Sequence, residues 1–474
     1  MPTPPPLTAA LVRSAAAYAE HWLSFRRRYL RVPGVQAAVG FGDEEVLSTA
    51  SGHADVESDV ALTPDHLFRI ASHSKTFTGT AVMQLAEAGA LRLDDAVGTH
   101  VDWLEDACAD LAPVTVRELL AHGGGVTRDG DDADHWQLDR PFPDEAGLRA
   151  VVERDGSVLP ANTRFKYSNI GYALLGLVVE SASGRSYNDY VRAKIVDRLD
   201  LTDTAPELDP ARAGDLATGY SALSYADTRV PIDHVDTRAM SAATGFTSTA
   251  RDLCRYLSAH VLGATRLLTD GSKRLMQRDE WEVKEGETWY GLGLSVSRTG
   301  DRRMVGHGGG YPGHATRSMV DPKAGLAVSV LTNAIDGPAA ELATGVVKLI
   351  DLTADTDRDG DRDAVAPEVL DRFCGRFANL WGVLDIVRLG DRLYGLSPAD
   401  ADPAEEPTEL AVEDADTLLI RESSGLRSPG ERLTFEIDDR GVRAIRGRGG
   451  MTYYPYDEFS ARMADRDRVR LAGG

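Results

Sequence analysis

Hydrophobic residues recur along the chain at two spacings. Apolar side chains every three to four positions predict helices, and these segments are 7–30, 72–88, 114–126, 163–184, 248–262 and the stretch PAAELATGVVKLI. Alternating apolar and polar residues predict strands, and these are VQAAVGFG at 35–42, the run that follows it, and four short runs between 289 and 334. Helices therefore separate an early hairpin from later strands. This order predicts an α+β domain in which both ends share one antiparallel sheet.

The last part of the chain has a different pattern. The segment DTDRDGDRDAVAPE at 355–368 is rich in aspartate and predicts a solvated acidic linker. A calcium loop is the alternative, but the twelfth position counted from Asp355 is Ala366 rather than a glutamate. Short strands with turn residues between them fill 369–474, which predicts a small all-β barrel. The expected organisation is a domain at 1–354, the linker, and the barrel.

The composition excludes several classes of partner. Against 52 Lys and Arg there are 74 Asp and Glu, so the formal charge is −22, a field that repels phosphate backbones and anionic lipids. We therefore expect neither nucleic-acid nor membrane binding. The sequence has no apolar window of membrane-spanning length and no signal-peptide pattern, so a cytoplasmic location is expected. The three cysteines lie far apart and without a CxxC pair, so no zinc site is expected. No cofactor is expected either, and the oligomeric state stays open.

The sharpest chemical pattern is Ser72-His73-Ser74-Lys75, at the start of a predicted helix. The chain has seven lysines, and only Lys75 has a serine three positions before it. That spacing places the Ser72 hydroxyl and the Lys75 amine on one helix face. A hydroxyl needs a base to become a nucleophile, and an amine can serve when burial and the helix N-terminus lower its pKa. The amide of Ser72 can also donate to an oxyanion.

Two further patterns carry polar groups that fit the same chemistry. Tyr167-Ser168-Asn169 precedes a predicted helix. A phenol near an ammonium is expected to ionise more easily and to pass on a proton, and an asparagine amide can hold a substrate carbonyl. The run GHGGG at 306–310 lies between strands, and its glycines allow the backbone to approach a ligand and to offer amides to an oxyanion.

In this order and at these separations, the three patterns resemble those of the penicillin-recognising serine hydrolases. The similar branch is the class C β-lactamase-like one, with its family VIII esterases, D-aminopeptidases and D-Ala-D-Ala carboxypeptidases. Its S-x-x-K, Y-x-N and H-x-G elements match Ser72 to Lys75, Tyr167 to Asn169, and His307 to Gly309. The resemblance implies a β-lactamase/transpeptidase-like domain, with an antiparallel sheet flanked by helices and an all-α subdomain. FCGRFANLWG at 373–382 resembles the opening strand of the lipocalin-like barrels that follow this domain in several relatives.

The resemblance also implies a role for each matched residue. Ser72 is the nucleophile that becomes acylated, Lys75 is its base, and Tyr167 protonates the leaving group and later activates water. Asn169 orients the substrate. His307 and Gly309 belong to the substrate-binding strand, and the amides of Ser72 and Gly310 form the oxyanion hole. His122 matches a stretch that is usually structural in the family and is left out of the catalytic set.

One departure from the β-lactamase pattern affects the expected substrate. Those enzymes hold a permanent ammonium in the third element, whereas His307 is largely neutral at pH 7. A substrate carboxylate then lacks a charged partner unless Arg317 reaches the site. We therefore expect a serine hydrolase that acts through an acyl-serine on a small ester, amide or peptide, without a cofactor. The alternatives are an acyl transferase or peptide cyclase of the same fold, and a catalytically silent binding protein.

Overall fold

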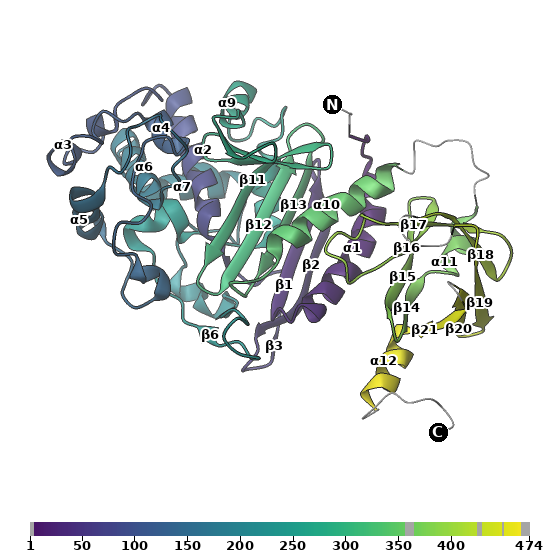
Figure 1. The fold of residues 1–474 in the computed structure, drawn as a ribbon. Helices are drawn as coiled ribbons and strands as arrows, with labels where there is room; N and C mark the ends of the chain where they lie inside the picture. The colour runs from purple at the N-terminus through teal and green to yellow at the C-terminus, as the bar shows by residue number, and fades with distance from the viewer. Residues whose placement is uncertain (1–3, 356–364, 424–428, 448–449, 466–474) are drawn as a thin grey trace. The chain divides into compact units, whose positions relative to one another are not determined.

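The computed structural model describes residues 4–355, 365–423, 429–447 and 450–465 (Figure 1). Within these residues the chain forms two compact units. The first is Leu30–Ala343, and the second combines the chain up to Tyr29 with the chain from Thr344 onward. The predicted acidic linker, with its calcium-like start, lies mostly outside the described residues. The domain boundaries expected from the sequence stay a prediction.

The first unit is built on an antiparallel sheet that has nine strands in the described residues, in the order β3-β2-β1-β13-β12-β11-β10-β9-β8. The strands are β1 (Gly34–Phe41), β2 (Glu44–Asp55), β3 (Val60–Ala61), β8 (Trp281–Lys284), β9 (Thr288–Tyr290), β10 (Ser295–Thr299), β11 (Arg302–Tyr311), β12 (His314–Asp321) and β13 (Leu326–Thr332). β1 pairs with β13, and Val39 lies opposite Val328. Early and late strands thus meet inside one sheet, which confirms the prediction from the hydrophobic pattern.

Helices and short strands fill the chain between β3 and β8. The helices are α2 (Ser74–Glu87), α3 (Leu104–Ala107), α4 (Val116–Leu120), α5 (Glu145–Asp155), α6 (Asn169–Ser183), α7 (Tyr187–Val191), α8 (Ala250–Ser258) and α9 (Asp270–Met276). The short strands are β4 (Phe68–Arg69), β5 (Gly219–Tyr220), β6 (Pro231–Ile232) and β7 (Thr247–Ser248). α8 packs on β1, β12 and β13, and α2 packs against α6.

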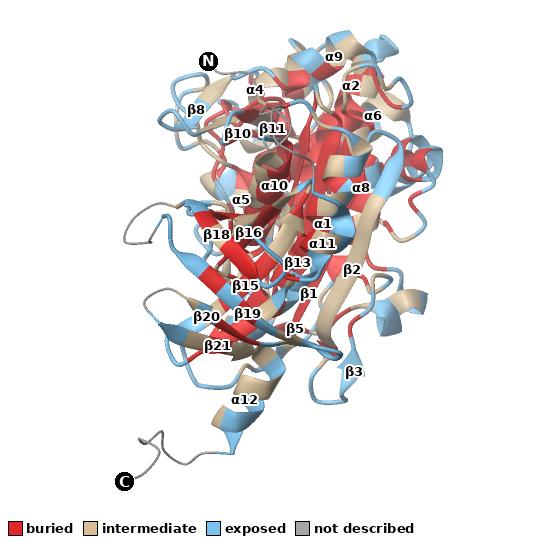
Figure 2. Cartoon of the chain, turned by 90° about the vertical axis from the view of Figure 1, so that its right-hand side faces the viewer, coloured by how far each residue is buried: buried red, intermediate tan, exposed pale blue. Residues whose placement is uncertain are grey.

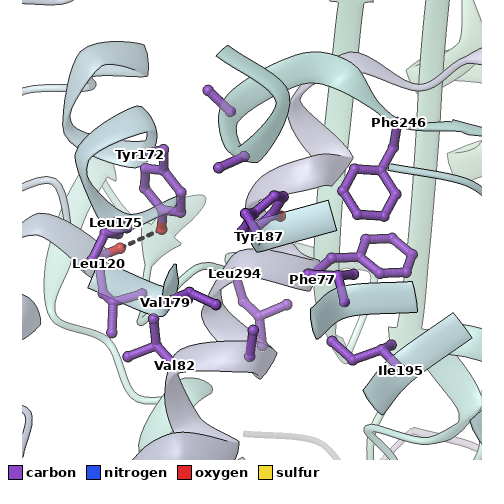
Figure 3. Packing of buried hydrophobic residues seen from close by; sticks show 14 of the residues in the cluster. Phe77, Val82, Leu120, Tyr172, Leu175, Val179, Tyr187, Ile195, Phe246 and Leu294 are labelled. Carbon is purple, nitrogen blue, oxygen red and sulfur yellow. Dashed lines mark hydrogen bonds between the residues drawn. The ribbon is translucent and has the colours of Figure 1, made fainter. Parts of the chain in front are cut away.

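The core around α2 holds that helix firmly. Figure 3 shows Phe77 of α2 beside Phe246, and their ring centroids are 4.4 Å apart. The Tyr172 hydroxyl of α6 donates to the carbonyl of Leu120, 2.6 Å away, which ties α6 to the end of α4. Every α2 residue from Ser74 to Met83 is buried. The first turn of α2 is therefore fixed by the packing of the whole helix.

The helix ends follow the signals in the sequence. Gly89 has a φ of +71° just after α2, the left-handed conformation that glycine adopts most easily. Thr249 caps α8 and accepts from the amide of Asp252. The segment predicted as a helix at 114–126 is helical only at α4, because the chain turns at His122, whose φ is +61°.

The second unit contains a closed barrel of eight strands in the described residues. They are β14 (Gly375–Asn379), β15 (Gly382–Leu389), β16 (Arg392–Leu396), β17 (Thr408–Val412), β18 (Thr417–Glu422), β19 (Arg432–Asp438), β20 (Gly441–Gly447) and β21 (Met451–Pro455). Phe377, Ile386, Leu418, Phe435 and Ile445 belong to its buried core. The predicted barrel is confirmed, and its lipocalin-like character stays a prediction.

In the part of the chain that the structure describes, four helices accompany the barrel strands. They are α1 (Ala9–Tyr29), α10 (Ala339–Asp355), which begins in the first unit, α11 (Pro367–Asp371) and α12 (Tyr456–Ala464). In Figure 2 the barrel strands alternate between buried and exposed stretches, whereas α12 has no buried residue. None of the described helices combines the length and the apolar character that crossing a membrane requires.

Candidate active site

The predicted nucleophile lies on a sharp turn between a strand and a helix. β4 pairs with β7, with Phe68 opposite Ser248, and this pairing anchors the chain just before the turn. Ala71 then has a φ of +48°, a left-handed conformation that is costly for a residue with a Cβ. Ser72 follows, and α2 begins at Ser74. The backbone thus holds Ser72 at the start of a buried helix, where main-chain amides have no helical acceptor.

The structure brings the three predicted catalytic side chains together at one oxygen. The Lys75 Nζ lies 3.2 Å from the Ser72 Oγ. The Tyr167 hydroxyl donates to the same Oγ from 2.9 Å, although it is far away in the sequence. A base and a proton donor thus both contact the hydroxyl that would attack a substrate.

The surroundings of Lys75 favour its neutral form. Its side chain is fully buried, and burial lowers the pKa of its amine to about 7, although Asp129 opposes this shift. The Nζ donates to the Oδ1 of Asn169 at 2.7 Å and to the carbonyl of Ala243 at 2.8 Å. A neutral amine has two hydrogens and one lone pair. The two hydrogens satisfy these acceptors, and the lone pair is left to accept the proton of Ser72.

Tyr167 is a proton donor rather than an anion in this geometry. Burial raises the pKa of its phenol well above the usual value. This is the opposite of the sequence expectation, because the apolar surroundings outweigh the neighbouring amine. A phenol that keeps its proton can donate to Ser72 in the resting site and to a leaving group during a reaction.

Asn169 is held between Lys75 and a residue that the sequence analysis missed. Its Oδ1 accepts from Lys75, and its Nδ2 donates to the Asp129 Oδ1 at 2.8 Å. The indole of Trp136 donates to the same Asp129 oxygen at 3.0 Å. The second oxygen, Oδ2, lies 3.4 Å from the Nε of Arg128. No motif marks Asp129 in this aspartate-rich loop, so only the fold reveals that it lies beside the site.

His307 is neutral and bonded at both ring nitrogens. Its Nδ1 lies 2.6 Å from the carbonyl of Gly308, which can only accept, so Nδ1 carries the proton. Its Nε2 therefore accepts from the Tyr290 hydroxyl at 3.1 Å. Burial is the main reason that the pKa of His307 lies well below its usual value, and Lys75 adds to the effect. The ring is thus part of the wall of the site and carries no charge for a substrate.

Arg317 does not supply the missing charge. It pairs with Gly308, whereas the next residue, Ser318, pairs with His307. Neighbouring residues on a strand point to opposite faces of the sheet. Ser318 contacts His73 at the start of α2, so Arg317 points to the other face, where it donates to the Ser297 hydroxyl at 3.1 Å.

The glycines of β11 lie along a strand edge. β10 pairs with β11 only as far as Gly306, so beyond it no other described strand covers this edge. A Cβ at Gly309 would lie 2.2 Å from the carbonyl of Ile70, so β11 passes directly beside the turn that carries Ser72. A Cβ at Gly310 would meet open space. The oxyanion role of the Gly310 amide stays a prediction.

The sequence matches the Beta-lactamase family over residues 24–351. The chain belongs to the beta-lactamase family. Penicillin-binding protein 4 of Amycolatopsis lactamdurans is 30% identical over 318 residues, which cover 64% of this chain and 81% of that protein. Protein flp of Staphylococcus aureus (strain COL) is 28% identical over 190 residues, which cover 40% of this chain and 38% of that protein.

Solved structures of similar proteins share the fold. The penicillin-binding protein homologue from Pyrococcus abyssi, described as octameric, has 24% identity and a TM-score of 0.62, and the match covers 92% of this chain and 99% of that one. The D-amino acid amidase from Ochrobactrum anthropi SV3 has 25% identity and a TM-score of 0.59, with coverage of 74% and 100%. The predicted β-lactamase/transpeptidase-like fold and the resemblance behind it are thus confirmed.

The described residues contain no cluster of three or more His, Cys, Asp or Glu side chains arranged to hold a metal ion.

Proposed function

We propose that this member of the beta-lactamase family is a serine hydrolase that forms an acyl-Ser72 intermediate from a small ester or amide. The observation that carries the proposal is the geometry at the Ser72 Oγ, which lies 3.2 Å from a buried Lys75 amine and 2.9 Å from the Tyr167 hydroxyl. A hydroxyl becomes nucleophilic when an adjacent base takes its proton, and this pair supplies both the base and a proton donor.

The proton transfers return Ser72, Lys75 and Tyr167 to their starting protonation states. Lys75 takes the Ser72 proton as Oγ attacks the substrate carbonyl, and the amides of Ser72 and Gly310 receive the negative charge on the carbonyl oxygen. Tyr167 gives its proton to the leaving group and regains one from the Lys75 ammonium. A water molecule then gives a proton to this pair as it attacks the acyl carbon, and Ser72 leaves with a proton.

We propose that the acyl group of the substrate carries a protonated amine. The Asp129 carboxylate lies beside the machinery: its Oδ1 accepts from Asn169, and its Oδ2 lies 3.4 Å from the Nε of Arg128. A negative oxygen at this position favours a cationic substrate group. The similarity to a D-amino acid amidase supports this substrate class. With a neutral His307 and with Arg317 on the other face of the sheet, β-lactams that carry a carboxylate are poor candidates.

Covalent labelling tests the proposal. A fluorophosphonate should add to Ser72 of the wild-type protein, as located by mass spectrometry, and should not add to a Ser72→Ala variant. Turnover is then measured on p-nitrophenyl esters, on D- and L-aminoacyl amides and on nitrocefin. Failure to label the wild type, under conditions that label a known serine hydrolase, would show that the proposal is wrong.

Acyl transfer is the alternative outcome for the same acyl-enzyme. Product analysis with and without an added amine distinguishes the two reactions, because a transferase yields a new amide when the amine is present. Free acid as the only product in both cases supports hydrolysis.

A further inference from the structure

His122 binds the backbone on both sides of Tyr167, the proposed proton donor. It follows α4 in the left-handed conformation, with a φ of +61°. Its carbonyl accepts from the amide of Lys166 at 2.8 Å, and its ring Nδ1 accepts from the amide of Ser168 at 3.1 Å. These two bonds hold the backbone on both sides of Tyr167.

The His122 ring also packs directly against the Tyr167 ring. Their centroids are 4.2 Å apart, and the ring centroids of Tyr290 and Tyr172 lie 4.7 and 4.9 Å from that of His122. The imidazole is thus one wall of the space that fixes the direction of the phenol.

The choice of an imidazole at this position has an identifiable reason. Since Nδ1 accepts a hydrogen bond, the proton of the neutral ring is on Nε2. This Nε2 is buried and has no hydrogen-bond partner among the described residues. An apolar side chain would fill the space without leaving a donor unbonded. Unlike an apolar side chain, the imidazole has an acceptor at Nδ1, which binds the amide of Ser168.

We propose that His122 is a positioning residue for Tyr167, which orients the phenol toward Ser72 and the leaving group through the two bracketing bonds and the ring contact. The inference rests on the proposed function. It assigns a role in the reaction to a residue that does not touch the reacting atoms. A shift of Tyr167 of about 1 Å would lower the rate by about 10²-fold, because proton transfer depends on geometry.

Substrates whose leaving groups differ in basicity distinguish a positioning role of His122 from a general loss of structure. An amide nitrogen must be protonated before it leaves, whereas p-nitrophenolate leaves without a proton. A displaced Tyr167 therefore slows acylation by an amide much more than acylation by an ester, which is followed as the burst of p-nitrophenolate released before the water step. A general loss of packing slows both alike.

The experiment combines two substitutions of His122 with one of Tyr167. His122→Gly removes the ring and tolerates the left-handed backbone, and His122→Asn keeps an acceptor near the Nδ1 position. We expect His122→Gly to lower kcat for an amide by about 10²-fold with KM unchanged, and to slow acylation by a p-nitrophenyl ester far less. We expect His122→Asn to keep most of the wild-type kcat for the amide. In a Tyr167→Phe background, His122→Gly should add less than about twofold, because both changes remove the same step.

A buried histidine outside the site provides the matched control. His260 is buried and packs against Tyr256, and its Nδ1 finds no hydrogen-bond partner in the described part of the chain. We expect His260→Ala to lower the melting temperature and to leave the amide-to-ester ratio unchanged. If His122→Gly does not fold, His122→Ala replaces it in the comparison with His122→Asn.

Each result leads to a definite conclusion. Equal losses on amide and ester, additive effects with Tyr167→Phe, or no rescue by His122→Asn would overturn the role of His122 while leaving the serine hydrolase in place. A wild-type protein that neither labels at Ser72 nor turns over any substrate would overturn the proposed function, and this inference with it.

Discussion

The charge on Lys75 decides whether Ser72 can react. In water a lysine amine is protonated at neutral pH, but burial lowers the pKa of Lys75 to about 7. Only the neutral amine can take the Ser72 proton. We therefore expect kcat/KM for an uncharged ester to rise about tenfold per pH unit below pH 7 and to level off above it. A pH–rate profile whose rising limb lies near pH 10 would contradict this assignment.

Asp129 opposes the effect of burial on Lys75. Its carboxylate stabilises the ammonium and raises the pKa of Lys75. In Asp129→Asn the carbonyl oxygen still accepts from Asn169 and Trp136, but the charge is gone. We expect the rising limb of the pH–rate profile to move to lower pH, and KM for amine-bearing substrates to increase by about tenfold, the size of one charge-assisted bond.

The matched control for Asp129 is Asp132 in the same loop. It pairs with Arg140, and its side chain is 42% exposed. Asp132→Asn should leave both the pH–rate profile and KM unchanged. If both variants have the same effect, the overall charge of the loop rather than the position of Asp129 is responsible.

At the scale of the elements, β11 and the turn before α2 fit together at one glycine. A Cβ at Gly309 would lie 2.2 Å from the carbonyl of Ile70 and 2.5 Å from the Thr316 Oγ1, whereas one at Gly310 would meet nothing within 4 Å. Gly309→Ala must therefore displace β11 or the turn that carries Ser72. We expect it to lower kcat/KM by about 10²-fold or more, while Gly310→Ala stays near the wild type. Equal effects of the two substitutions would contradict this packing.

The sequence predicts the site elements well because their chemistry depends on local spacing. Ser72 and Lys75 share one helical turn, and Tyr167 comes just before the N-cap of α6, so the patterns place each group on its element. The contacts of Asp129 and His122 are different. Both lie on the loop after α4, and they reach the site through pairing with the segment around Tyr167, far away along the chain.

Burial explains the other differences between expectation and structure. A sequence shows which groups are near one another on an element, but not how much water surrounds them. The pKa of Tyr167 rises rather than falls for this reason. The side of the sheet to which Arg317 points depends on the register of β11 and β12, and the register appears only when the strands are paired.

At the scale of the whole molecule, the pattern predicts both the sheet and the barrel but not the grouping of α1. An amphipathic helix shows that one face is buried, not which element covers it. The residues up to Tyr29 form one compact unit with the chain from Thr344 onward. Within that unit, the Tyr18 hydroxyl of α1 donates to the Asp385 carboxylate of β15 at 2.9 Å. Helix and barrel are thus joined through a buried polar contact that hydrophobic spacing does not reveal.

The same carboxylate provides a test of how this unit is held together. Arg376 donates to both Asp385 oxygens, at 2.7 and 2.8 Å, and the Asp385 side chain is 3% exposed. Asp385→Ala removes the carboxylate that binds Arg376, whose side chain is 22% exposed, so we expect it to destabilise the second unit by about 3 kcal/mol. Asp371→Ala breaks a more exposed pair with Arg388 and should cost less than about 1 kcal/mol.

Denaturant titrations with hydrogen exchange of the β15 amides would measure both changes, and fluorophosphonate labelling of Ser72 should persist in both variants. Equal destabilisation by the two substitutions would mean that the buried Asp385 contacts stabilise this unit no more than the exposed pair does.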